Sequence, residues 1–140
     1  MSIRTRVKFE VSISSDSNEA KDLGYLKGET FTDFMGEGGA WKTVLPKSTT
    51  NMLVTMPNIA EVKILLIKVN SVDPTLTVPE ITIRRNSNGA EEIKITPYGA
   101  TSTSPKESWL FLTTSGLTSI YSTNPSSTTD VNLTIFMAGD

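Results

Sequence analysis

Few of the side chains that enzymes use for catalysis occur in this chain of 140 residues, which has no histidine and no cysteine. Histidine is the commonest general base and transition-metal ligand, and cysteine supplies thiolate nucleophiles, disulfides and zinc ligands. Their absence excludes Ser-His-Asp and Cys-His mechanisms. Any chemistry must therefore come from carboxylates, lysines, arginines, hydroxyl groups and aromatic rings.

Two segments partly match ligand-binding loops, but neither completes its motif. Residues 36–42, GEGGAWK, lack the glycine spacing of a phosphate-binding loop, and the next residues predict a strand where that motif needs a helix. Residues 16–22, DSNEAKD, are rich in side-chain oxygens, but Lys21 stands where a calcium loop of the EF-hand type needs glycine. We therefore predict no cofactor and no metal site.

Carboxylate pairs that hydrolyse glycosides are defined by their separation in space, which a sequence does not give. The candidates mostly adjoin lysine, proline or turn residues: Glu61, Asp73, Glu80, Glu91, Glu92 and Asp130. We predict that the protein is not an enzyme and has no catalytic residues.

The remaining candidates are binding residues. Arg4, Arg6 and Lys8 alternate with apolar or neutral residues, so they share one face of an expected first strand. They form either a solvated face with edge-protecting charge or a basic stripe that docks on an acidic partner. Tyr98, in a loop with proline and glycine, is the aromatic residue best suited to stack on a sugar, whereas Trp109 is predicted to be buried.

Short stretches of alternating apolar and polar residues predict β-strands along most of the chain, and no window of about 12 residues keeps a helical period. Gly28 predicts a turn between two short strands, and Asn88-Gly89 predicts the turn of a hairpin. The expected fold is all-β, an antiparallel β-sandwich or jelly roll of roughly eight to ten short strands. We expect a single domain over residues 1–140.

The segment 129–140, TDVNLTIFMAGD, keeps a strand-like alternation where many domains fray. Four apolar residues share one face of it: Val131, Leu133, Ile135 and Met137. This pattern predicts an interior strand of the sandwich.

Residues 62–69 and 109–112 are apolar on both faces. A two-layer sandwich has one interior, so each strand should have one apolar and one polar face. We therefore predict that one face of each stretch is covered by another chain, with Leu65, Ile67 and Leu112 as candidate partner-binding residues. The alternative is that loops such as 14–24 or 97–107 fold over the outer sheet face and bury these residues within the chain.

The net charge of −2 provides no strong field for nucleic acid or an anionic membrane. No apolar stretch approaches the ~18 residues of a membrane span, and no signal peptide is apparent at the N-terminus. We expect neither nucleic acid nor membrane as a partner.

The whole pattern resembles the small virion proteins of tailed bacteriophages, which include capsid decoration (cement) proteins and small tail or fibre components. The features are a cysteine-free, Ser/Thr-rich, all-β chain that closes on VNLTIFMAGD, with Met137-Ala138-Gly139-Asp140 as the local match. The resemblance implies a virion structural protein, assembled in the host cytoplasm, that stabilises a capsid lattice. Its implied partners are copies of itself, for example in a trimer, and a major capsid or other virion protein.

A tail or fibre module that binds a host-surface glycan is the alternative function. In that case Tyr98 and the loops at residues 99–107 and 122–130 would form the binding surface. The resemblance transfers no functional residue to either function, because this type of protein has no catalytic motif to match.

Overall fold

The computed structural model describes residues 3–13, 24–34, 38–56, 59–97 and 107–139. Every regular element in these ranges is a β-strand, which confirms the predicted all-β fold. The described ranges contain no helical segment capable of spanning a bilayer. The chain divides into two compact units, Met1–Met35 and Gly36–Asp140. The sandwich is built within the second unit, and the single domain expected over residues 1–140 stays a prediction.

The first unit contains two antiparallel strands, β1 (Ile3–Ile13) and β2 (Gly24–Phe34). Their pairing runs without interruption from Ile3 opposite Phe34 to Ile13 opposite Gly24. The predicted turn at Gly28 is wrong, because Gly28 lies inside β2 and pairs with Phe9. Glycine favours turns locally, but here the pairing with β1 keeps the chain extended.

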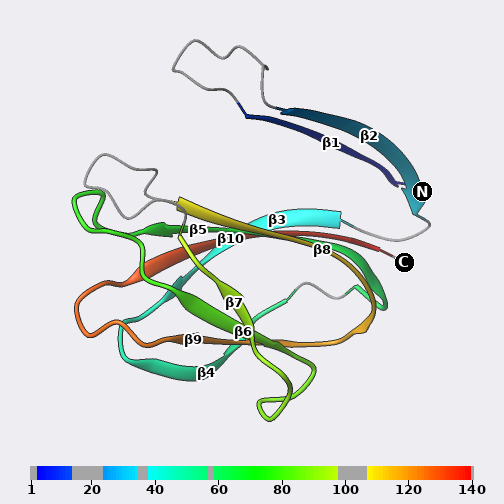
Figure 1. Cartoon of the computed structure of the whole chain (residues 1–140). Helices are drawn as coiled ribbons and strands as arrows, with labels where there is room; N and C mark the ends of the chain where they lie inside the picture. Colours follow the sequence, from blue (N-terminus) through cyan, green and yellow to red (C-terminus); the bar gives the residue numbers. More distant parts are fainter. Residues whose placement is uncertain (1–2, 14–23, 35–37, 57–58, 98–106, 140) are drawn as a thin grey trace. The chain divides into compact units, whose positions relative to one another are not determined.

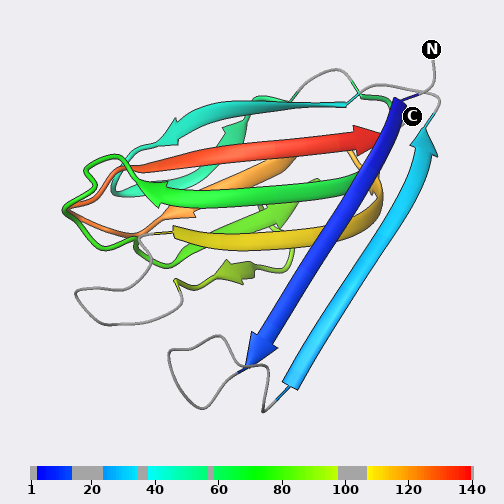
Figure 2. The same ribbon diagram turned by 90° about the horizontal axis from the view of Figure 1, so that it is seen from above.

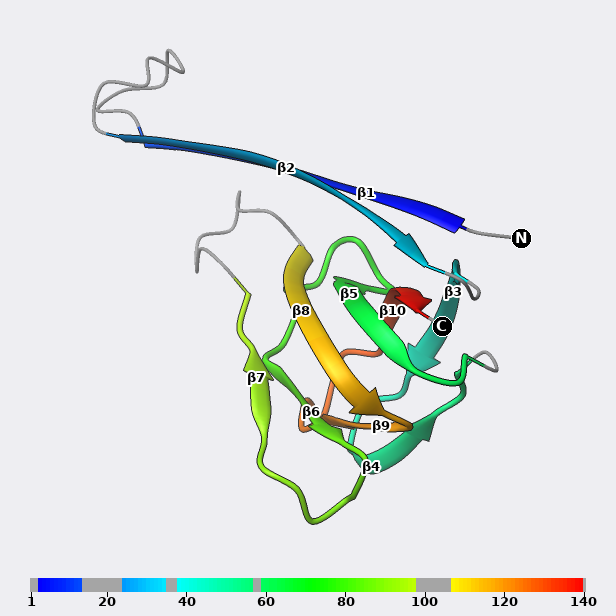
Figure 3. The same ribbon diagram turned by 90° about the vertical axis from the view of Figure 1, so that its right-hand side faces the viewer.

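The second unit is a sandwich of two four-stranded antiparallel sheets (Figure 1, Figure 3). One sheet has the order β3-β10-β5-β8, and the other has the order β4-β9-β6-β7. The eight strands are β3 (Gly38–Leu45), β4 (Thr49–Val54), β5 (Val62–Ser71), β6 (Ile81–Arg85), β7 (Ile93–Ile95), β8 (Glu107–Leu117), β9 (Ile120–Asn124) and β10 (Val131–Gly139).

Successive strands alternate between the two sheets, except for β6 and β7, which pair with each other. This strand order is that of a jelly roll. The loop between β6 and β7 contains the predicted turn, since the Ala90 amide donates a hydrogen bond to the Ser87 carbonyl across Asn88 and Gly89.

β10 is an interior strand, as its alternation predicts. It lies between β3 and β5, as Figure 2 shows. Val131, Leu133, Ile135 and Met137 are each 0% exposed. They belong to the core between the two sheets, which also contains Leu45, Val54, Val62, Leu65, Ile67, Val69, Ile81, Ile83, Leu117 and Ile120.

A buried amide fixes the loop between β9 and β10. The Asn124 side-chain nitrogen donates to the carbonyl oxygens of Leu45 (3.3 Å) and Thr129 (2.8 Å), and its oxygen accepts from the Ser126 amide at 3.1 Å. Each polar atom of this amide has a partner, as a buried polar group requires. This part of the glycan loop expected at residues 122–130 therefore has a structural role.

Candidate binding face

The outer face of the β3-β10-β5-β8 sheet, the side opposite the core, contains two chemically different halves. We call one row across the sheet the apolar row; it consists of Ala40, Phe136, Leu66 and Phe111. Two further rows make up the polar end. They consist of Lys42, Thr134, Lys68 and Trp109, and of Val44, Asn132, Asn70 and Glu107.

For the stretches that are apolar on both faces, residues 62–69 and 109–112, the prediction chose the wrong face as the one that contacts a partner. Leu65 and Ile67 are 0% exposed in the core, and Leu112 is partly buried against it. The strand pairing sets their neighbours on the opposite, outer face, where Phe111 is 46% exposed. Both faces of these strands are apolar, so alternation alone did not decide which face points inward.

Trp109 is also exposed, contrary to the sequence prediction, with 55% of its surface in solvent. It pairs with Lys68 on β5, and the Lys68 ammonium nitrogen lies over the indole, 5.2 Å from the ring centroid. The indole nitrogen donates to a Glu107 carboxylate oxygen at 3.2 Å, and the other Glu107 oxygen accepts from Lys68 at 2.6 Å. These three residues hold the exposed indole in one orientation through a cation–π contact, a hydrogen bond and an ion pair.

The pKa of Glu107 is lowered, mainly by its hydrogen bond to Lys68 and further by the hydrogen bond from Trp109, against a partial desolvation that raises it. Because the pKa of Glu107 is lower in the folded state, the Lys68–Glu107 ion pair is fully formed at any pH above the ordinary pKa of a glutamate, about 4.3. It is lost as the pH falls through the lower folded-state pKa.

Trp109 fluorescence should report this protonation. In a Trp41→Phe background, Trp109 is the single tryptophan of the chain. We expect its emission to change in a titration with a midpoint below about pH 4.3, because the folded carboxylate resists protonation. The same titration of Glu107→Gln should show no such step. We call these contacts of Lys68 and Glu107 with the indole the clamp on Trp109. A titration midpoint at or above the ordinary pKa of a glutamate would contradict it.

A recess of about 530 Å³ opens beside this cluster, lined by Lys42, Lys68, Asn70, Ser71, Pro74, Glu107 and Thr134. The Ser71 side chain is 4% exposed, and its hydroxyl has no hydrogen-bond partner among the described residues. Lys42 forms no ion pair with any residue in the described ranges. Ser71 shares the inward face of β5 with Ile67 and Val69, so the group of the recess that is open to a ligand is the Lys42 ammonium, beside Asn70 and Thr134.

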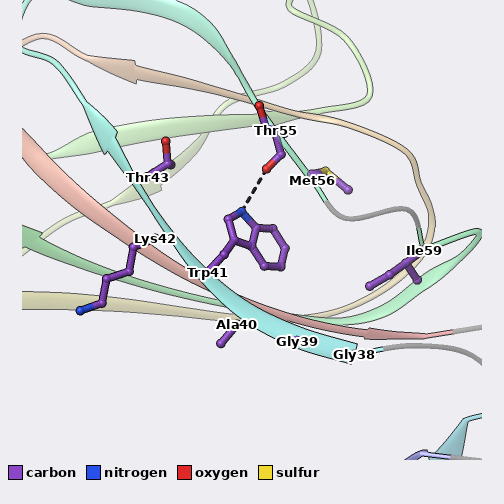
Figure 4. A pocket seen from close by; sticks show the side chains of 9 residues that line it. All are labelled: Gly38, Gly39, Ala40, Trp41, Lys42, Thr43, Thr55, Met56 and Ile59. Carbon is purple, nitrogen blue, oxygen red and sulfur yellow. Dashed lines mark hydrogen bonds between the residues drawn. The ribbon is translucent and has the colours of Figure 1, made fainter.

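A second depression, of about 540 Å³, lies beside Trp41 and the adjoining glycines Gly38 and Gly39 (Figure 4). The Trp41 indole nitrogen donates to the Thr55 carbonyl oxygen at 3.0 Å. Since Trp41 belongs to an edge strand of one sheet and Thr55 follows an edge strand of the other, this bond links the two sheets. Its role is structural. Of the segment 36–42, the described residues Gly38 to Lys42 lie within β3 and are therefore extended strand.

Other predicted residues contribute less to this picture. Lys8 is exposed on β1, whereas the side chains of Arg4 and Arg6 and the whole of Tyr98 lie outside the described part of the chain. Several carboxylates have partners of their own: Glu61 with Lys63, Glu80 with Lys94, Glu92 with Arg84, and Asp130 with the Lys47 amide. Within the described ranges, acidic residues form no group of three suited to a metal ion.

No protein-family model, curated protein or solved structure matches this chain. The functional argument therefore depends on the jelly-roll topology and on the outer face of the β3-β10-β5-β8 sheet.

Proposed function

We propose that this protein is a non-catalytic structural protein of a bacteriophage virion, which decorates a capsid by packing the apolar row against another protein chain. The observation behind the proposal is the exposure of Phe111 next to the partly buried Leu66 and Phe136 on one sheet face. A contiguous apolar surface on a soluble domain is typical of a protein–protein interface. Support also comes from the resemblance to small virion proteins, and the jelly roll occurs in viral capsid domains, which is an analogy of fold alone.

The position of the apolar row suits a docking surface. The row crosses all four strands of the sheet and ends at β8, which is an edge strand. β8 has no charged residue from Ser108 to Leu117, so it lacks the lysines that commonly protect sheet edges. Large aromatic residues such as Phe111 commonly contribute much of the binding energy of a protein–protein interface.

Decoration needs only a modest affinity at each site. Neighbouring capsid subunits repeat the same surface, and an oligomer of the decorating protein binds several copies at once. The effective concentration at the second and third sites is then high, so modest interfaces sum to stable attachment. No reaction is required, in agreement with the residue types that the chain lacks.

Phe111→Ser should weaken capsid binding. Removing a large, half-exposed aromatic side chain from the interface should reduce the affinity about tenfold or more. Co-sedimentation of the full chain with expanded capsids of the phage that encodes it measures the effect.

Leu53→Ser is the matched control for this prediction. Leu53 is 58% exposed on β4, in the other sheet, and its loss should leave binding unchanged. Both variants should melt within a few degrees of the wild type. Equal binding by Phe111→Ser and the wild type, or the absence of any capsid binding by the wild type, would contradict the proposal.

A further inference from the structure

We propose that the polar end of the outer face binds an anionic oligosaccharide, with Trp109 as the stacking platform and Lys42 as the partner of the acidic group. This site uses none of the residues of the apolar row. It therefore goes beyond the capsid-decorating function and does not depend on it.

The first support is the state of Trp109. An exposed indole normally samples several orientations, and fixing one on binding costs entropy. Here Glu107 holds the indole nitrogen and Lys68 lies over the ring, while more than half of the side chain stays in solvent. The ring is thus already oriented before a ligand arrives. An amphipathic aromatic surface of this kind suits the apolar C–H face of a sugar ring.

The second support is the set of polar groups in the recess beside it. The ammonium of Lys68 is already paired with Glu107, whereas Lys42 has no ion pair in the described ranges, so the recess has one uncompensated positive charge. Asn70 and Thr134, which line the same recess, add an amide and a hydroxyl on the outward faces of β5 and β10.

The third support is the distance across the site. Trp109, Lys68, Thr134 and Lys42 stand in register on four successive strands. Neighbouring strands are about 4.8 Å apart, so the backbones at Trp109 and Lys42 are separated by roughly 14 Å. One pyranose ring does not span that distance. A ligand that stacks on Trp109 and reaches Lys42 with a carboxylate therefore has at least two rings.

The exposed indole together with the polar groups of the recess favours a saccharide over an acidic peptide as the ligand. Lys68 and Thr134 lie between Trp109 and Lys42, and Asn70 and Glu107 lie in the next row, so the recess also contains an amide, a hydroxyl and a carboxylate. Such groups match the closely spaced hydroxyls of a sugar, which both donate and accept. Pockets with an apolar platform and a few convergent polar groups commonly bind small ligands. The jelly-roll topology also occurs in lectin domains, again as an analogy of fold alone.

Binding of the labelled full-length protein to a glycan array tests the proposal. The array contains sialylated and uronic-acid oligosaccharides, each printed beside its neutral parent. We expect the wild type to bind acidic glycans of two or more rings. Trp109→Ala should lower the apparent affinity about tenfold or more, as loss of an aromatic anchor does. Lys42→Gln should remove the preference for the acidic glycan over its neutral parent.

Two control variants separate this site from other surfaces. Phe111→Ser should bind glycans as the wild type does, since Phe111 belongs to the apolar row, and Leu53→Ser should also have no effect. Conversely, Trp109→Ala should retain capsid binding. Three results would overturn the proposal: no glycan bound above background, equal binding of acidic and neutral glycans, or unchanged binding by Trp109→Ala. Loss of glycan binding in Phe111→Ser alone would move the site to the apolar row.

Discussion

A chain that lacks residues 131–140 is expected to be unfolded in water. The deletion removes β10 from between β3 and β5, so it leaves two strands of one sheet without their shared partner. It also removes Val131, Leu133, Ile135 and Met137, which are fully buried. Burying a side chain of this kind contributes about 1.5–3 kcal/mol. Four of them approach the whole net stability of a typical domain, about 5–15 kcal/mol.

Circular dichroism and the dispersion of amide proton signals measure this outcome. The truncated chain should give neither a strand spectrum nor a cooperative melt. Adding a synthetic peptide of residues 129–140 should restore both in part, because the missing strand has a defined place in the sheet. Thr134→Ser, on the outer face of the same strand, serves as the control and should remain folded. A truncated chain that melts cooperatively near the wild-type temperature would show that β10 is dispensable.

Substitution by lysine should affect the stability of the protein very differently at the neighbouring residues Leu65 and Leu66 of β5. Leu65→Lys is expected to unfold the sandwich, because Leu65 is 0% exposed and the variant must bury an ammonium among apolar side chains. Such substitutions commonly cost more than about 4 kcal/mol. Leu66→Lys places the same charge on the outer face, where it can reach solvent. It should cost about 1–2 kcal/mol and leave a folded protein that binds capsids poorly.

Urea unfolding of the two variants measures the difference. The urea midpoint of Leu66→Lys should fall by about 1 M or less, with an unchanged slope, whereas Leu65→Lys should show no folded baseline. Similar loss of stability in both variants would mean that the two faces of β5 are equally enclosed. In that event the apolar row would be part of the core and not a docking surface.

Alternation of residue types was enough to predict the strands but not the orientation of two of them. β10 has four apolar residues on one face, and its interior position followed directly from that pattern. Residues 62–69 and 109–112 have large apolar residues on both faces, so the hydrophobic pattern alone gave no preferred side. Pairing with neighbouring strands decides the matter, and pairing is a long-range property.

The sequence did contain a signal for the outer face that the hydrophobic residues obscured. In an extended strand alternate residues share a face, so Lys68 and Asn70 lie on the same face as Leu66, and Glu107 lies on the same face as Trp109. A charged residue rarely points into a core. Applied to residues 107–112, this rule would have placed Trp109 outside. In residues 62–70 it does not decide, because Lys63 alternates in phase with Leu65 and Lys68 with Leu66, and only the irregular pairing between Val62 and Ile64 resolves the conflict. The clamp on Trp109 was harder to foresee, because Lys68 and Glu107 meet only through the pairing of β5 with β8.

The place of β10 in the middle of its sheet also bears on how the protein is made. During synthesis, β3 and β5 leave the ribosome long before their common neighbour, and their edges stay unpaired until residues 131–139 have emerged. At about 5–20 residues per second, the wait from the end of β5 lasts several seconds. The jelly-roll order further requires pairing between distant parts of the chain, which is intrinsically slow. Nascent chains on neighbouring ribosomes of one messenger thus expose complementary strand edges to each other, and chaperone occupancy during this interval should determine the yield of native protein.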